Sequence, residues 1–156
     1  METIIIATDG SDTAKEAGSR GLSLLRPVDK VLVVSVADLA DPDLAQDATG
    51  HAAATMTPDE VEAENEGALA QGQSNVDATI EALRAHPGLP SGLETRVLGG
   101  QAGPALCDLA SETEAIAIVM GSSGRGGLRR AVLGSVSDHV VRHAPCPVVV
   151  TRARPQ

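Results

Sequence analysis

The chain has 156 residues, a formal net charge of −9 and a pI near 4.7, and this length is enough to bury a core within one domain. It contains no Phe, Tyr or Trp, so the core must be aliphatic, and any site that stacks nucleic-acid bases on aromatic rings is excluded. The acidic balance argues against nucleic acid or an anionic membrane as a partner, and no apolar stretch is long enough for a signal sequence or a membrane span. We therefore expect one cytoplasmic domain over residues 1–156.

Short apolar runs alternate with helical patterns along the first part of the chain. Residues 4–7 form a run that predicts a buried strand, and residues 14–25 repeat small and apolar side chains at helical spacing, with Ser11 as a natural N-cap. Residues 31–36 form a second uninterrupted run, which is typical of a parallel sheet covered on both faces. Residues 37–56 are acidic and irregular, which predicts a surface loop.

A capping box predicts the start of a long helix after this loop. Thr57 can cap the helix, Pro58 suits its first position and Glu60 completes the box. We expect Gly67 and Gly72 to weaken the helix by about 1 kcal/mol each relative to alanine. The side chains available for burial are Val61, Ala68, Val76, Ile80 and Leu83.

The alternation of strand and helix continues to the end of the chain. Residues 93–98 predict a third, less buried strand, and residues 102–110 carry a helical stripe. Residues 116–120 predict a fourth buried strand, which a glycine-rich loop separates from a short helix beginning near Ser135, and residues 148–150 form a last strand. The pattern predicts an α/β fold with an open, mostly parallel sheet. The apolar side of the short helix would comprise Val136, Val140 and Val141.

The glycine-rich loop after the fourth strand predicts an anion site. Glycines let backbone amides approach an anion closely, and the N-terminus of the next helix, at Gly134 and Ser135, offers further amides. Arg125, Arg129 and Arg130 lie between these two groups of amides and would offset phosphate charge. This combination suits a polyphosphate, although a flexible turn followed by a capping serine explains the same residues.

The motif Gly121-x2-Gly124-x9-Gly134-Ser135 resembles the ATP-binding motif of universal stress proteins. The resemblance includes the end of the first strand, residues 100–110, where the family often has Pro in place of Ala102, and residues 145–150. It implies a Rossmann-like fold of the adenine nucleotide alpha-hydrolase type, with five parallel strands in the order 3-2-1-4-5 and helices on both faces. It also implies a homodimer paired through the last strand, Val148-Val149-Val150, whose exposed edge would otherwise favour aggregation.

The resemblance further implies a bound adenine nucleotide, ATP with Mg²⁺. Asp9 would lie near the ribose and adenine, the backbone of Val36 would meet the adenine edge, and Gly134 and Ser135 would hold the outer phosphates. Magnesium would come with ATP, near Asp9 or Ser135, because no site for a metal held by the protein alone is implied. The residues assigned to the nucleotide are Ala7, Thr8, Asp9, Val36, Met120, Gly121, Ser122, Ser123, Gly124, Arg125, Gly126, Gly134, Ser135 and Val136.

Three functions stay open on this basis. The first is a nucleotide-dependent regulator of the stress response with little or no catalysis, because the chain has a phosphate loop but no P-loop lysine motif. The second is a slow ATPase or autokinase, with Asp9 as base or magnesium ligand and Ser122, Ser123 or Ser135 as phosphate acceptor. The third is a partner-binding module that needs no nucleotide, with residues 37–56 as its binding surface.

Two other groups of residues contain side-chain types that bind metals, the histidines of the last helix and the two cysteines. His139 and His143 have metal-ligand spacing on one helix, but Asp138 is the only further ligand nearby in sequence, and histidines also suit a helix C-terminus. Cys107 and Cys146 stand far apart in sequence without a Cys-x-x-Cys pair, so neither a zinc site nor a disulfide framework is implied.

Overall fold

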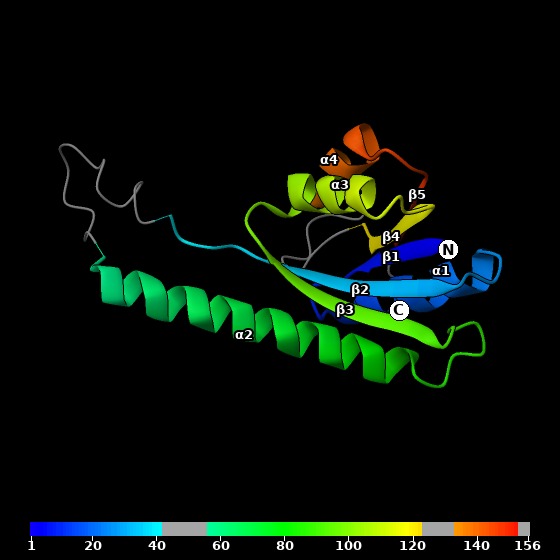
Figure 1. Cartoon of the computed structure of the whole chain (residues 1–156), viewed down its shortest axis with the longest axis horizontal. Coiled ribbons are helices and arrows are strands. Elements are labelled where there is room, and N and C mark those ends of the chain that lie inside the picture. The colour runs from blue at the N-terminus through cyan, green and yellow to red at the C-terminus, as the bar shows by residue number, and fades with distance from the viewer. Residues whose placement is uncertain (42–55, 123–132, 153–156) are drawn as a thin grey trace.

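The computed structural model describes residues 1–41, 56–122 and 133–152, and these ranges contain one parallel sheet with the strand order β3-β2-β1-β4-β5 (Figure 1). The predicted order and parallel direction are confirmed. The elements are β1 Thr3–Ala7, α1 Asp12–Leu24, β2 Lys30–Ala37, α2 Pro58–Leu83, β3 Gly92–Gly99, α3 Ala102–Glu112, β4 Ala117–Gly121, α4 Ser135–His143 and β5 Val148–Thr151.

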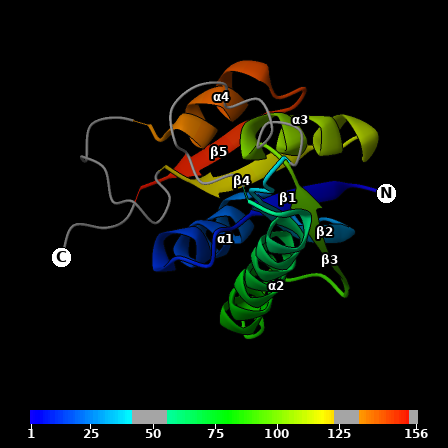
Figure 2. The ribbon, with the colours of Figure 1, turned by 90° about the vertical axis from the view of Figure 1, so that its left-hand side faces the viewer.

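Helices cover both faces of the sheet, with α1 and α2 on one face and α3 and α4 on the other (Figure 2). Successive residues of β1 alternate between the two faces, as a pleated strand requires. Ile4 and Ile6 belong to the apolar cluster that includes Leu22 of α1 and Val76 of α2, whereas Ile5 belongs to the cluster under α3 and α4. This burial on both faces explains why the central strands read as uninterrupted apolar runs.

Side-chain caps fix the starts of α1 and α2 as the sequence predicts. The Ser11 hydroxyl accepts the Ala14 N–H at 3.2 Å. At α2, Thr57 Oγ1 accepts the Glu60 N–H at 3.3 Å, and Glu60 Oε2 accepts the Thr57 N–H at 2.7 Å. The pKa of the exposed Glu60 carboxyl is lowered below its ordinary value of 4.5, mainly by the bond from the Thr57 N–H and next by the bond with the Thr57 side chain.

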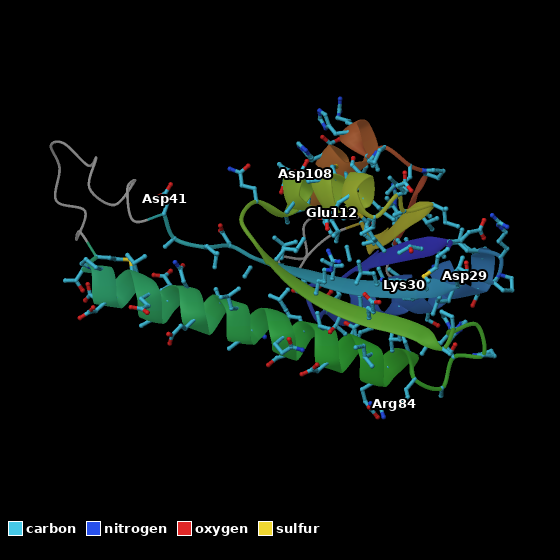
Figure 3. The ribbon with its side chains drawn as sticks, in the orientation of Figure 1. Asp29, Lys30, Asp41, Arg84, Asp108 and Glu112 are labelled. Atoms are coloured by element: carbon cyan, nitrogen blue, oxygen red, sulfur yellow. The ribbon has the colours of Figure 1, made fainter. Side chains whose placement is uncertain are left out.

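Among the described residues, acidic side chains gather at the start of α2. Asp41 lies beyond the end of β2, next to Ala40, whose N–H donates to Asn65 Oδ1 in the N-terminal half of α2 at 2.8 Å, and Arg84 lies at the opposite end of that helix (Figure 3). Five acidic side chains on the first nine residues of α2 are exposed, so they form a solvated face. They are Asp59, Glu60, Glu62, Glu64 and Glu66.

Two details differ from the sequence expectations, and a third adds a packing reason for one glycine. Gly72 is buried, and a Cβ placed on it would lie 2.6 Å from Val97 Cγ1, so this glycine allows α2 to approach β3 closely. Val141 does not pack: it is 48% exposed, because α4 turns Val140 rather than Val141 into the core. The N-cap of α4 is Gly134, which makes Ser135 the first helical residue rather than the cap.

Within the described ranges, no helix combines the length and apolar character needed to cross a membrane.

Candidate functional site

Those predicted site residues that the structure describes lie at the carboxyl edge of the sheet, which faces the viewer in Figure 2. Strand β1 lies between β2 and β4, so the chain progresses in opposite directions on the two sides of β1. This reversal is the position at which open α/β sheets bind ligands, beyond the carboxyl ends of the strands. Asp9 follows β1, Val36 lies near the end of β2, and Gly121 ends β4.

The turn between β1 and α1 is held by its own side chains. Asp9 Oδ1 accepts the Ser11 N–H at 3.0 Å, and Gly10 has a φ of +77°, the left-handed region that favours glycine. Asp9 therefore stabilises the turn, which is the structural role that the sequence also allows. The Thr8 side chain lies on the α2 face of the sheet, with its Oγ1 2.7 Å from Thr79 Oγ1.

The end of β4 and the start of α4 are joined directly. The Gly134 N–H donates to the Ser122 carbonyl at 2.8 Å, and the buried Ser137 hydroxyl lies 3.0 Å from both that carbonyl and the Gly134 carbonyl. These bonds bring together, at the carboxyl edge, the two ends of the motif that runs from Gly121 to Ser135. Ser123, Gly124, Arg125 and Gly126 lie outside the described residues, so their nucleotide contacts stay predictions.

A pocket of about 420 Å³ opens beside this junction, within the range of small-ligand pockets. It lies between the end of β2, the turn that joins β3 to α3, and the first turn of α4. Neither the N-cap of α3 nor that of α4 makes a side-chain cap bond, so no N-cap side chain occupies the first-turn amides of these helices. The lining residues are Val36, Asp38, Gly100, Gln101, Ala102, Gly103, Pro104, Ser135, Val136 and His139.

Three of the predicted nucleotide residues line this pocket: Val36, Ser135 and Val136. Ala7 and Met120 are buried in the core cluster under α3 and α4, at 8% and 6% exposure. Val36 and Val136 of the pocket lining pack against this same cluster. The structure thus brings the end of β2 and the start of α4 together around one pocket, while the Thr8 side chain lies on the other face of the sheet.

The segment from Gly100 to Pro104 and His139 are pocket residues that the sequence reasoning did not assign to the ligand. A signal for the first was present, because the Gly99-Gly100 turn follows a parallel strand and must lie at the same edge as the other strand ends. Gly103 has a packing reason: a Cβ on it would lie 2.8 Å from the His139 ring, so α3 and α4 approach closely here.

The two histidines of α4 pack against each other. Their rings stack with centroids 4.2 Å apart, and His143 Nδ1 lies 2.9 Å from the His139 carbonyl oxygen. The nearby Asp138 pairs with Arg142 at 3.0 Å. Across the described ranges, no three His, Cys, Asp or Glu side chains gather as a metal site would require.

The two cysteines lie in one apolar cluster. Cys107 is buried, and Cys146 packs against the same cluster from the segment before β5. Burial, and secondarily the Asp108 carboxylate, raises the pKa of the Cys107 thiol. Cys107 is therefore a packed side chain under the sheet, as the sequence suggests.

A doubly wound parallel sheet with a pocket at its carboxyl edge defines an α/β protein of the Rossmann-like class. Comparison with known proteins gives the family. The chain belongs to the universal stress protein family, whose model matches residues 1–152.

Individual relatives agree with this assignment. The chain is 29% identical over 150 residues to a universal stress protein of Methanocaldococcus jannaschii, covering 96% of this chain and 81% of the relative. Among solved structures, the universal stress protein UspA from Lactobacillus plantarum has a TM-score of 0.71 at 24% identity, with 97% of each chain covered. At these identities the solved structures establish the fold alone.

Two solved relatives contain adenine nucleotides. A universal stress protein family protein from Arabidopsis thaliana with AMP bound has a TM-score of 0.62 at 18% identity, covering 99% of this chain and 93% of the other. A universal stress protein in complex with cAMP has a TM-score of 0.53 at 23% identity, with 96% of each chain covered. Nucleotide binding therefore occurs on this fold.

Proposed function

We propose that this chain binds an adenine nucleotide, ATP with Mg²⁺, in the pocket at the carboxyl edge and acts as a nucleotide-dependent regulator with little or no catalysis. The observation that carries the proposal is the pocket itself, which joins the end of β2 to the first turn of α4. Val36, Ser135 and Val136 were assigned to the nucleotide from sequence, and all three line it. The AMP and cAMP complexes of relatives support the ligand class.

The residues around the pocket suit the parts of such a ligand. Val36 and Val136 give apolar walls for a base, and the N-terminus of α4 offers amides and a partial positive charge for phosphates. The Ser135 hydroxyl is on the same first turn. Because Mg²⁺ usually keeps waters and binds substrate phosphates with one or two protein oxygens, it would arrive with the nucleotide rather than in a protein cage.

A binding role is better supported than turnover. Asp9 is the carboxylate that the sequence offers as a base, and its Oδ1 accepts the Ser11 N–H in the β1–α1 turn. A group committed to a turn is a poorer general base than one aimed at a bound water. The slow ATPase or autokinase is therefore the weaker hypothesis.

Absorbance gives a direct test, because the chain has no Trp, Tyr or Phe and an adenine would dominate the near-ultraviolet spectrum. We expect about one adenine per chain, either copurified or bound on titration of nucleotide-free protein with ATP, AMP or cAMP, with and without Mg²⁺. Val136→Glu puts a negative charge on the pocket wall and should abolish binding. Val141→Glu is the matched control, because Val141 is on the same helix but exposed and outside the pocket lining. Nucleotide-free wild type that binds none of the three nucleotides would refute the proposal.

We further propose a homodimer through β5. This strand is at an edge of the sheet, pairs with β4, and carries the partly exposed Val148, Val149 and Val150. An apolar edge of this kind is commonly covered by a partner strand. Sedimentation equilibrium measures the mass, and a monomer at micromolar concentration would contradict this proposal. The cytoplasmic location, the single domain over residues 1–156 and the absence of a nucleic-acid partner stay predictions.

A further inference from the structure

A chain of hydrogen bonds joins α2 to the turn that contains Asp9. The Gly10 N–H donates to Thr8 Oγ1 at 3.0 Å, Thr8 Oγ1 lies 2.7 Å from Thr79 Oγ1, and Thr79 Oγ1 donates to the Asn75 carbonyl at 2.8 Å. Thr8 is 7% exposed and Thr79 is 0% exposed, so water does not compete for the bond between the two hydroxyls. The turn after β1 is thus tied to a helix that lies about seventy residues further along the chain.

The number of available hydrogens fixes which group donates in each of these hydrogen bonds. A backbone N–H only donates, a carbonyl only accepts, and each hydroxyl has one hydrogen. Because Thr79 donates its hydrogen to the Asn75 carbonyl, Thr8 must donate to Thr79 while it accepts from Gly10. Loss of the Thr79 hydroxyl would leave the buried Thr8 hydroxyl without its acceptor.

A direct contact accompanies the hydrogen bonds. A Cβ on Gly10 would lie 2.5 Å from Asn75 Oδ1 and 3.2 Å from Asn75 Cα, so the turn rests on α2 with no room for a side chain. The Asn75 amide also donates to Ser35 Oγ of β2 at 3.3 Å. The position of the turn is therefore set by α2 as well as by the start of α1.

Asp9 lies between Thr8 and Gly10, the two turn residues that α2 holds. We propose that Thr79 is a positioning residue for nucleotide binding, which acts through the Thr8 hydroxyl to fix the backbone of the turn. The Thr8 N–H donates to the Val34 carbonyl of β2 at 2.8 Å, two residues before Val36 on the pocket wall, so the turn and the pocket share this strand end. This inference rests on the proposed function. It makes the packing of α2 a determinant of nucleotide affinity, although α2, with Thr79, is on the face of the sheet opposite α3 and α4 of the pocket.

The test compares variants that remove single hydroxyls. Thr79→Val keeps the shape and removes the hydroxyl, whereas Thr79→Ser keeps the hydroxyl. Thr113→Val is the matched control, because the Thr113 hydroxyl also donates to the carbonyl four residues earlier, that of Leu109 at 2.7 Å, at the other end of α3 from the pocket. Two quantities are measured: the exchange rate of the Gly10 amide in nucleotide-free protein, by NMR, and the Kd for the adenine nucleotide that binds wild type best.

We expect Thr79→Val to speed Gly10 exchange and to raise the Kd about tenfold, and Thr79→Ser to stay within twofold of wild type. Thr113→Val should lose stability without changing either quantity. If wild type binds nucleotide and Thr79→Val binds it with the same affinity, the positioning role is overturned while the proposed function stands. Equal loss of affinity in Thr113→Val also overturns it, since general destabilisation would then explain the effect. Wild type that binds no nucleotide refutes the proposed function and the positioning role with it.

Discussion

Two glycines in α2 should respond in opposite ways to the same substitution. Gly67 and Gly72 both lie in the interior of this helix. A Cβ on Gly67 would meet nothing within 4 Å, whereas a Cβ on Gly72 would lie 2.6 Å from Val97 Cγ1 on β3. We predict that Gly67→Ala stabilises the protein and that Gly72→Ala does not.

The magnitudes follow from helix propensity and packing. Alanine is about 1 kcal/mol more favourable than glycine in a helix interior, and both variants gain this amount. A carbon pair normally separates by about 3.5–4.0 Å, so Gly72→Ala overpacks the contact with Val97, at a cost of about 1–3 kcal/mol. The difference in free energy of unfolding between the two variants should therefore be about 1–3 kcal/mol in favour of Gly67→Ala.

Urea denaturation followed by circular dichroism at 222 nm measures both free energies, since the chain lacks aromatic residues for fluorescence. Val97→Ala completes a double-mutant cycle with Gly72→Ala, and the cycle should show a favourable coupling because the smaller side chain makes room for the new methyl group. Gly72→Ala that is as stable as Gly67→Ala, or an absent coupling, would refute the argument from close approach.

Two further predictions concern the capping box and the pocket. Thr57→Ala should lower the free energy of unfolding by about 1 kcal/mol at pH 7. Because folding lowers the pKa of Glu60, its ionised form contributes stability above pH 4.5, and this contribution is lost as the pH falls through the lowered value. Glu60→Gln should thus be less stable than wild type at pH 7 and equally stable in acid. A difference in free energy of unfolding that does not change with pH would contradict this. Gly103→Ala should destabilise the protein by about 1–3 kcal/mol and weaken nucleotide binding, because its methyl group meets the His139 ring on the pocket wall. Denaturation measures the free energy of unfolding, and titration measures the Kd for nucleotide. A Gly103→Ala variant with the wild-type value of both would count against the close contact of α3 and α4.

The strands and helix starts could be predicted from sequence because their causes are local. The apolar runs at residues 4–7 and 31–36 become central strands, since a strand buried on both faces needs apolar side chains at every position. Ser11 and Thr57 cap their helices with bonds that span three residues, which the sequence shows directly. The family motif supplied the strand order, which local patterns alone do not contain.

The tertiary structure decided which faces meet. The sequence shows Gly72 as a weak helix residue, and only the approach of β3 explains why glycine is needed there. Val140 and Val141 look equivalent in sequence, but the packing of α4 buries the first and exposes the second.

The same division holds for the candidate site. The sequence assigned Val36 to the ligand from its place at the end of the second strand, and Ser135 and Val136 from the family motif and the helix that it opens. All three line the pocket, and their contact with a nucleotide stays a prediction. His139 joins the same pocket, and Thr79 meets Thr8, through contacts between segments far apart in the chain. Sequence therefore determined the elements and the chemistry at their ends. Only the folded sheet determined which ends share one pocket, because that depends on how the helices pack across it.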